Sequence, residues 1–357
     1  MQPELSQLGF LEEWKIDQNE RGWDDFLLGR VILEHKERYT VSTGQEEWDA
    51  EILGNLRYTA TSRRDFPAVG DWVALQPYEE GKALIHGVFP RKSILERSAV
   101  GKQGEKQIIA TNIDYAFIVQ SVNRDFSINR LERYLTLCYD SGVEPIVILS
   151  KIDLIDGEQA KELVTQVKSR MNQVPVYAIS TLTGEGWEPL THLLETGKTY
   201  CLLGSSGVGK STILNALRGE EKMKTGEISG SIDRGKHVTT HRELVVLESG
   251  GILIDNPGMR EVGMTDNETG METTFEEILE LAQNCRFSDC SHTEEKGCAL
   301  LEAVDNGELD PEAYSHFMKL QREKARFEGT VREKRLKDKQ QGKLYKRIIN
   351  AKNKRHD

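Results

Sequence analysis

The sequence is poor in cysteine and contains no long apolar run. Its 357 residues include five cysteines, an odd number, and three of these crowd between Cys285 and Cys298. This spacing suits metal ligation in a reducing compartment better than a disulfide framework. Apolar runs such as Pro145–Leu149 are far too short to span a bilayer, and the N-terminus has no basic patch followed by an apolar stretch. We therefore expect a soluble, cytoplasmic protein.

Positive charge is also scarce, except at the C-terminal end. The chain has 47 Lys and Arg against 58 Asp and Glu, which gives a net charge of −11. Residues 319–357 reverse this balance with 15 Lys and Arg against 5 Asp and Glu. An acidic body is repelled by nucleic acid, so the tail predicts a polyanionic partner that the tail itself reaches. A solvated, partly helical tail without a partner fits the charge pattern too.

Residues 27–100 alternate short β-like runs with turn residues, after an N-terminal extension over residues 1–26. The runs are Gly29–Leu33, Tyr39–Thr43, Ala50–Leu53, Asp71–Leu75 and Ala83–Val88. Five strands in roughly 70 residues predict an OB-type β-barrel that binds RNA. Any small five-stranded barrel or sandwich without a ligand fits the same pattern. Five basic side chains would line its nucleic-acid face: Arg63, Arg64, Arg91, Lys92 and Arg97.

From residue 101 to residue 265, apolar strands alternate with helical stretches. Strands are expected at Tyr115–Gln120, Pro145–Ser150, Val174–Tyr177, Thr199–Leu203, Glu243–Glu248 and Gly251–Asp255. Helices are expected at Asn129–Tyr139, Glu158–Met171 and Ser211–Leu217. This alternation predicts an α/β domain with a parallel sheet covered by helices. The next domain covers residues 266–318 and contains an acidic helix at Thr274–Ala282 and the cysteine cluster. A basic helical tail follows over residues 319–357.

A phosphate-binding loop follows the strand Thr199–Leu203. Residues 204–212 match the pattern GxxxxGK[ST] between a strand and a helix, the context that this pattern requires. Backbone N–H groups would face the β-phosphate, Lys210 would reach the β and γ oxygens, and Ser211 would bind Mg²⁺. The expected nucleotide-binding residues are Gly204, Ser205, Ser206, Gly207, Val208, Gly209, Lys210, Ser211 and Thr212.

A second phosphate-side element follows the apolar strand that ends at Asp255. Residues 255–258 (DNPG) have the form DxxG. Asp255 would hold Mg²⁺ directly or through water, and Gly258 would offer its backbone N–H to the γ-phosphate. Alone, this tetrapeptide would indicate a simple turn, but the preceding strand and the upstream loop favour a nucleotide site.

A guanine-binding motif lies at the end of the strand Pro145–Ser150. Residues 150–153 (SKID) resemble the NKxD motif. Asp153 can accept the N1 and N2 hydrogens of guanine, which adenine cannot supply, while the stem of Lys151 covers the ring. Ser150 departs from the usual Asn. The departure puts nucleotide affinity in question, whereas guanine preference depends on Asp153.

A second base motif follows at residues 178–180, where Ser180 and its neighbours would present a backbone N–H to guanine O6. Both base motifs precede the phosphate loop at residues 204–212, although ordinary GTPases have the phosphate loop first. The motif order is therefore circularly permuted. As one consequence, the segment that senses the γ-phosphate leads directly into the C-terminal module, which the nucleotide state would reposition.

On these motifs, the sequence resembles the ribosome small-subunit-dependent GTPase A family over nearly its whole length. The motifs are GSSGVGKST at 204–212, DNPG at 255–258, RGKHVT at 234–239 and Cys285-x4-Cys290-x-His292-x5-Cys298. The resemblance implies a circularly permuted α/β P-loop GTPase domain, with an N-terminal OB-type β-barrel and a C-terminal α-helical zinc-knuckle domain. It also implies a protein that binds the 30S ribosomal subunit and its rRNA late in maturation, and we expect it to be a monomer.

The usual water-orienting residue of a GTPase is missing. Met259 occupies the place of the Gln that follows DxxG, so the attacking water has to be positioned from elsewhere. His237 matches the switch I histidine of the family and is the catalytic candidate, with Lys210. Thr239 is the expected switch I threonine for Mg²⁺ and the γ-phosphate, with Thr240 as the alternative. We expect slow intrinsic hydrolysis of GTP to GDP and phosphate, stimulated by rRNA.

Three thiolates and one imidazole lie within 14 residues, at Cys285, Cys290, His292 and Cys298. They form a closed ligand set for one structural Zn²⁺. Free cysteines in a helical hairpin are the alternative, and the spacing excludes a redox CxxC. The tail that follows would contact rRNA phosphates through Arg322, Lys324, Arg326, Arg332, Lys334, Arg335, Lys337 and Lys339.

Two other classes of function compete with a GTPase. A P-loop kinase or ATPase acting on a small molecule is disfavoured by Asp153 and by the lack of an obvious acceptor site. An RNA-binding module in which nucleotide is only a ligand is favoured by Met259. The retained set of Lys210, Ser211 and Asp255 argues against it.

Overall fold

The computed structural model describes residues 4–35, 38–60, 62–98, 106–123, 126–171, 173–219, 242–255 and 269–325. The chain forms two compact units, Met1–Glu96 with Ile108–Val262 and Arg97–Gln107 with Gly263–Asp357. Among the described helices, none has the length and apolar character that crossing a bilayer requires.

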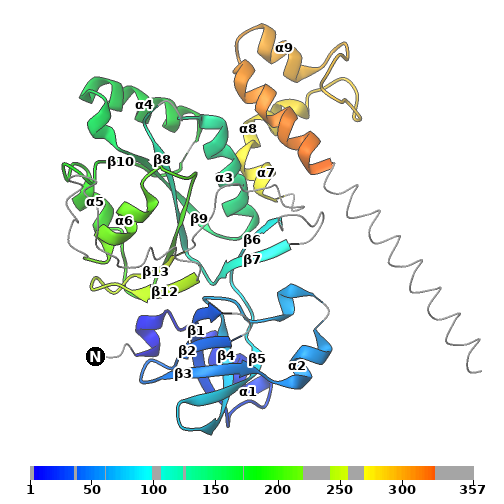
Figure 1. Cartoon of the computed structure of the whole chain (residues 1–357). Helices are drawn as coiled ribbons and strands as arrows, with labels where there is room; N and C mark the ends of the chain where they lie inside the picture. The colour runs from blue at the N-terminus through cyan, green and yellow to red at the C-terminus, as the bar shows by residue number, and fades with distance from the viewer. Residues whose placement is uncertain are drawn as a thin grey trace, which may run out of the picture. The chain divides into compact units, whose positions relative to one another are not determined.

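A five-stranded β-barrel occupies the N-terminal part of the first unit (Figure 1). Its strands are β1 (Leu27–His35), β2 (Arg38–Ser42), β3 (Glu47–Ile52), β4 (Trp72–Glu79) and β5 (Lys82–Val88). They pair in the order β1-β2-β3-β5-β4, and pairing of β1 with β4 closes the barrel around Val31, Val41 and Ile85. The short helices α2 (Gly54–Thr59) and η2 (Arg63–Asp65) connect β3 to β4. Each of the five predicted runs forms a strand, and the predicted barrel is confirmed.

The N-terminal extension packs against the outside of the barrel through η1 (Leu5–Leu8) and α1 (Glu12–Glu20). Leu8 and Trp14 are buried in one cluster with Trp72 and Phe89. Trp72 belongs to the outer face because side chains alternate along β4 and its neighbour Val73 lies in the barrel core. The extension is therefore part of the core of this unit.

A six-stranded sheet forms the rest of the first unit. Its strands are β8 (Tyr115–Ser121), β9 (Glu144–Ser150), β10 (Val176–Ile179), β11 (Thr199–Leu203), β12 (Arg242–Val246) and β13 (Ile252–Asp255). They run in the order β10-β9-β8-β11-β13-β12, and only the β12–β13 pair is antiparallel. Helices α3 (Ile128–Asp140) and α4 (Gly157–Arg170) contribute to one buried cluster, and α5 (Trp187–Thr191) and α6 (Lys210–Leu217) to a second. The predicted α/β domain is confirmed, and the carboxyl ends of β9, β10, β11 and β13 share one edge.

Strand β1 connects the barrel to this sheet. It pairs antiparallel with β12, with Leu33 opposite Glu243, so that eleven strands form one continuous sheet. Arg30, on the same strand, is 1% exposed and donates to the carbonyl oxygens of Leu8 at 2.6 Å, Gly70 at 3.1 Å and Asn112 at 3.2 Å. One guanidinium group therefore joins the N-terminal extension, the barrel and the segment that enters the sheet.

The second unit is helical. Helices α7 (Thr269–Thr274), α8 (Glu276–Ala282) and α9 (Ala299–Asp305) and the helical residues 311–325 enclose a core that includes Ile278, Leu300 and Phe317. The expected acidic helix corresponds to α8, which begins after its N-cap residue Phe275. Strands β6 (Ile94–Ser98) and β7 (Lys106–Thr111), which the sequence pattern did not predict, form a separate two-stranded sheet, and most of their residues belong to the first unit.

Candidate functional site

The loop between β11 and α6 depends on its glycines. Gly204, Gly207 and Gly209 have φ values of 145°, 82° and 99°, a region that other residues rarely adopt. A Cβ atom on Gly204 would lie 2.3 Å from the carbonyl oxygen of Val119 on β8. The glycines of the phosphate-loop pattern therefore stand where the backbone needs them, and α6 begins directly afterwards at Lys210.

Lys210 folds back over this loop. Its Nζ donates to the carbonyl oxygens of Gly204, at 2.7 Å, and of Ser205. Burial lowers the pKa of Lys210 to about 8, and no acidic group in the described part of the chain offsets this effect. A desolvated cation without a counter-charge fits an anionic phosphate ligand. Ser211 and Thr212, in the same turn, are exposed and accessible to one.

Two side chains from the end of β9 contact the phosphate loop. Ser150 Oγ donates to the carbonyl oxygen of Val208 at 2.6 Å, and Lys151 Nζ donates to that of Gly207 at 2.6 Å. Ser150 is buried, and Lys151 has a left-handed backbone with φ of 62°. The base motif and the phosphate loop are therefore joined by two hydrogen bonds.

Asp153 and Ser180 lie side by side. Asp153 sits in the short helix η3 (Ile152–Leu154), and Ser180 follows β10, which is in register with β9. Ser180 Oγ donates to Asp153 Oδ1 at 2.5 Å and accepts from the backbone N–H groups of Leu182 and Thr183 at 3.2 and 3.1 Å. Ser180 therefore holds the carboxylate of Asp153 in one orientation.

Asp255 ends β13, the neighbour of β11 in the sheet. Burial raises the pKa of Asp255, an effect that Arg218 opposes and Glu243 reinforces. A partly desolvated carboxylate at this edge fits the binding of a divalent cation, which favours the ionised form.

Three predicted site residues, His237, Thr239 and Gly258, lie outside the described residues, as do Met259 and the tail from Arg326 onward. The other predicted nucleotide-binding residues lie at the shared carboxyl edge of the sheet or on the first turn of α6. The fold thus brings together base and phosphate motifs that are separate in the sequence.

One contact of the phosphate loop has no signal in the sequence motifs. Tyr134, on α3, is 4% exposed, and its hydroxyl group hydrogen-bonds to the side chain of Ser205. Burial raises the pKa of Tyr134, and this hydrogen bond opposes the rise. A tyrosine on the apolar face of a helix is indistinguishable in sequence from a core residue, and its only signal is a hydroxyl group that needs a partner when buried.

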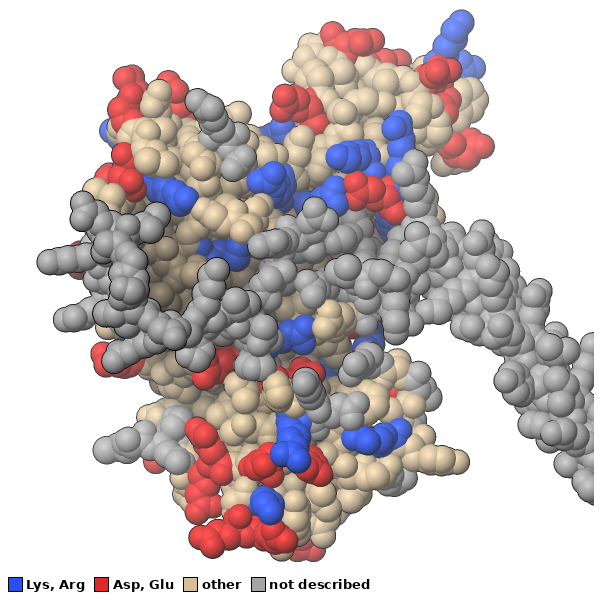
Figure 2. All heavy atoms as spheres, viewed as in Figure 1, with Lys and Arg blue, Asp and Glu red and all other residues tan. Residues whose placement is uncertain are grey.

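Two of the basic residues expected to face nucleic acid form ion pairs with acidic residues of the N-terminal part. Arg91 forms an ion pair with the buried Asp71 at 2.6 Å, and its side chain is 9% exposed. Arg64 pairs with Glu96. Figure 2 shows Lys and Arg side chains interspersed with Asp and Glu on the visible face of the barrel, in the lower part of the view. For Arg91 the expectation of an RNA-facing side chain is wrong, because the barrel uses it structurally.

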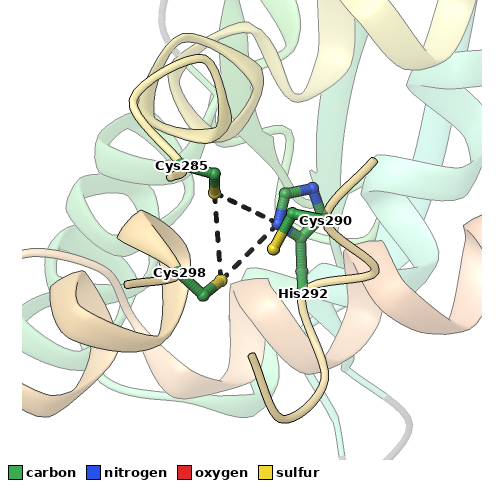
Figure 3. Close-up of side chains that lie close together, drawn as sticks. All are labelled: Cys285, Cys290, His292 and Cys298. Carbon is green, nitrogen blue, oxygen red and sulfur yellow. Dashed lines mark hydrogen bonds between the residues drawn. The ribbon is translucent and has the colours of Figure 1, made fainter. Parts of the chain in front are cut away.

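In the second unit, the four predicted metal ligands converge (Figure 3). The ligand atoms of Cys285, Cys290, His292 and Cys298 lie within 4.8 Å of one another. Nδ1 of His292 is 3.5 Å from Sγ of Cys285 and 3.6 Å from Sγ of Cys298, and these two sulfurs are 4.0 Å apart. Three of the four ligands line a groove of about 750 Å³, which gives a metal ion access to the cluster.

The strand order, the permuted motifs and their meeting at one sheet edge define a circularly permuted P-loop GTPase. A profile of the RsgA GTPase family matches residues 88–265. "Small ribosomal subunit biogenesis GTPase RsgA 2" of Listeria monocytogenes serotype 4b (strain F2365) is 45% identical, with 83% of each chain covered. The protein of the same name from Vibrio parahaemolyticus is 37% identical over 98% of this chain and 94% of its own. The chain belongs to the RsgA GTPase family.

Two solved structures have the same architecture. YjeQ from Thermotoga maritima has a TM-score of 0.62 and 28% identity, covering 84% of this chain and 98% of its own. YloQ, described as a circularly permuted GTPase, has a TM-score of 0.60 and 26% identity, and the match covers 84% of this chain and 95% of the YloQ chain. The predictions of a permuted GTPase fold and of a GTP-hydrolysing enzyme are confirmed.

Proposed function

We propose that this GTPase binds the 30S ribosomal subunit and acts late in its maturation, with turnover that rRNA stimulates. The observation that carries the proposal is similarity, over 83% and 98% of the chain, to proteins named small ribosomal subunit biogenesis GTPases. An OB-type barrel and a basic C-terminal tail are surfaces of the kind that bind RNA. The protein would act as a cytoplasmic monomer.

Guanine specificity rests on Asp153. Its carboxylate, held by the hydroxyl group of Ser180, would accept the N1 and N2 hydrogens of guanine, and the stem of Lys151 would cover the ring. Adenine offers no matching pair of donors. The same Lys151 and the buried Ser150 tie this base pocket to the phosphate loop.

The phosphates would bind along residues 204–212. Lys210 would exchange its two carbonyl acceptors for the β and γ oxygens. Ser211 and Asp255 would hold a Mg²⁺ ion that enters with GTP and neutralises charge developing on the phosphates. Gly258 would offer its backbone N–H to the γ-phosphate.

His237 would orient or activate the attacking water, and Thr239 would contact Mg²⁺ and the γ-phosphate. Met259 has no group for this task. GTPases that lack their activating partner run about 10⁵-fold below the stimulated rate, so we expect slow turnover until rRNA orders this segment.

The Cys₃His cluster would hold one structural Zn²⁺. Zn–S bonds of about 2.3 Å and Zn–N bonds of about 2.0 Å place tetrahedral ligand atoms roughly 3.5–3.8 Å apart. The separations of 3.5, 3.6 and 4.0 Å in this cluster fit that geometry, with His292 binding through Nδ1. Four protein ligands leave no open position, so the metal would stabilise structure and take no part in hydrolysis.

The decisive experiment measures GTP and ATP hydrolysis by the full chain, with and without purified 30S subunits. We expect GTP-selective turnover that 30S subunits accelerate, and Lys210→Ala should abolish it. An unchanged rate with 30S subunits would overturn the proposed stimulation, whereas a lack of co-sedimentation with them would overturn the proposed partner.

A further inference from the structure

The metal ligands are held in two different ways. Cys285 follows α8, and Cys298 is the residue before α9, so helices fix both. Cys290 and His292 lie in a loop without regular secondary structure. His292 also has a left-handed backbone with φ of 59°, which is unfavourable for a residue with a side chain. This half of the site needs support from elsewhere.

A single carboxylate provides that support. Glu295 accepts the backbone N–H of Ser291 at 2.9 Å, of Thr293 at 3.0 Å and of Glu294 at 3.1 Å. It also accepts the hydroxyl group of Ser291. These donors lie on both sides of His292 in the chain.

Glu295 connects the loop to the rest of the site. Its own carbonyl oxygen accepts the backbone N–H of Cys298 at 3.3 Å. Its carboxylate is not among the converging ligand atoms, and the backbone and hydroxyl donors occupy both of its oxygens. Glu295 is therefore placed to support the metal ligands and not to bind the metal.

A second side chain, that of Tyr314, holds the backbone of His292. Tyr314, in the helical residues 311–325, donates its hydroxyl proton to the carbonyl oxygen of His292 at 2.5 Å. Its ring packs against the core of the second unit.

We propose that Glu295 and Tyr314 are positioning residues that pre-form the Cys290–His292 loop for metal binding. The inference rests on the proposed zinc site and adds which residues of this chain set its affinity. Because five hydrogen bonds to these two side chains already order the loop, metal binding does not have to restrict it. Loss of outer-shell contacts of this kind weakens metal affinity by about 10- to 100-fold.

The test measures zinc affinity and the rate of zinc release of the full-length protein by competition with a chromogenic chelator. Glu295→Ala should weaken affinity about 10- to 100-fold and speed release, and Glu295→Gln should have a smaller effect because one oxygen remains. Glu294→Gln is the matched control, because the adjacent Glu294 contributes only its backbone N–H. The zinc affinity of this variant should stay within about twofold of the wild-type value.

Tyr314→Phe keeps the packed ring and removes only the hydroxyl group, so it tests the inference even if Glu295→Ala fails to fold. It should also speed zinc release, and the cobalt-substituted variant should show altered d–d bands. Wild-type affinity and release in Tyr314→Phe and in Glu295→Gln would overturn the inference. Absence of zinc from the wild-type protein would instead overturn the zinc site itself.

Discussion

Ser150 occupies a position where guanine-binding motifs usually have Asn, yet its hydroxyl group reaches the phosphate loop. The buried hydrogen bond from Ser150 Oγ to the carbonyl oxygen of Val208 is 2.6 Å long. Ser150→Ala leaves this carbonyl without its donor, which costs about 1–1.5 kcal/mol, so GDP affinity should fall about 5- to 10-fold. Titration with a fluorescent GDP analogue checks this. Ser169→Ala, on the exposed side of α4, is the control, and equal affinity in both variants would contradict the role of Ser150.

Lys210 makes nucleotide affinity depend on pH. Its lowered pKa of about 8 means that the free protein loses this charge above pH 8, while bound phosphates restore the pKa towards 10.5. Binding then takes up a proton, so the Kd for GDP should be constant from pH 6.5 to 7.5 and rise above pH 8, by up to about tenfold per pH unit. Lys210→Met should bind weakly and lose most of this dependence. A Kd that rises equally in both proteins would assign the effect to the nucleotide.

At the residue scale, the sequence identifies the functional side chains that belong to a local motif. The phosphate loop at residues 204–212 could be recognised from its motif and from the strand and helix on either side, because its conformation depends on its own glycines. The contacts of Ser150 and Tyr134 with that loop cross 58 residues or more, so no local pattern contains them. In the motif itself, Ser150 shows only that the usual Asn of NKxD is replaced.

Strand β1 is the element that couples the barrel to the GTPase sheet, and Arg30 is its least replaceable side chain. Burial lowers the pKa of Arg30 to about 10, and the charges of Asp114 and Asp71 oppose this decrease. The three hydrogen-bond acceptors of Arg30 are all backbone carbonyl oxygens. Arg30→Met should destabilise the protein by about 3 kcal/mol, since these buried acceptors lose a donor. Urea unfolding measures the change.

The matched control is Arg38→Met on strand β2 of the same barrel. Arg38 pairs with Glu51 at 3.7 Å, and both side chains are more than half exposed. We expect Arg38→Met to lower the free energy of unfolding by less than about 1 kcal/mol. Equal midpoints for the Arg30 and Arg38 variants would show that the buried guanidinium group does not hold the segments together.

At the element scale, alternation and length located every strand of the barrel and the sheet to within a few residues, because both are local properties. The pairing of β1 with β12 was not predicted, since it joins strands that lie at opposite ends of the first unit in sequence. The packing of the N-terminal extension was also missed. Its apolar residues Leu8 and Trp14 pack against Trp72 and Phe89, which lie more than 50 residues away in the sequence.

At the scale of the whole molecule, the two units have separate sources of stability. The nucleotide-binding unit has two large apolar clusters on its sheet as well as those of the barrel. Among its described residues, the second unit has a core around Ile278, Leu300 and Phe317 that includes Cys298 of the Cys₃His set. A metal bound by this set would therefore stabilise the core around it.

Removal of zinc should therefore destabilise the second unit and spare nucleotide binding. A zinc-selective chelator in excess Mg²⁺ should lower the temperature at which helical circular dichroism is lost and make residues 269–325 more susceptible to protease, since bound metal stabilises this unit. Affinity for a fluorescent GDP analogue should stay within about twofold, because the described nucleotide-binding residues all belong to the first unit. Readdition of zinc should restore the thermal stability. Parallel loss of GDP binding would show instead that the metal stabilises both units together.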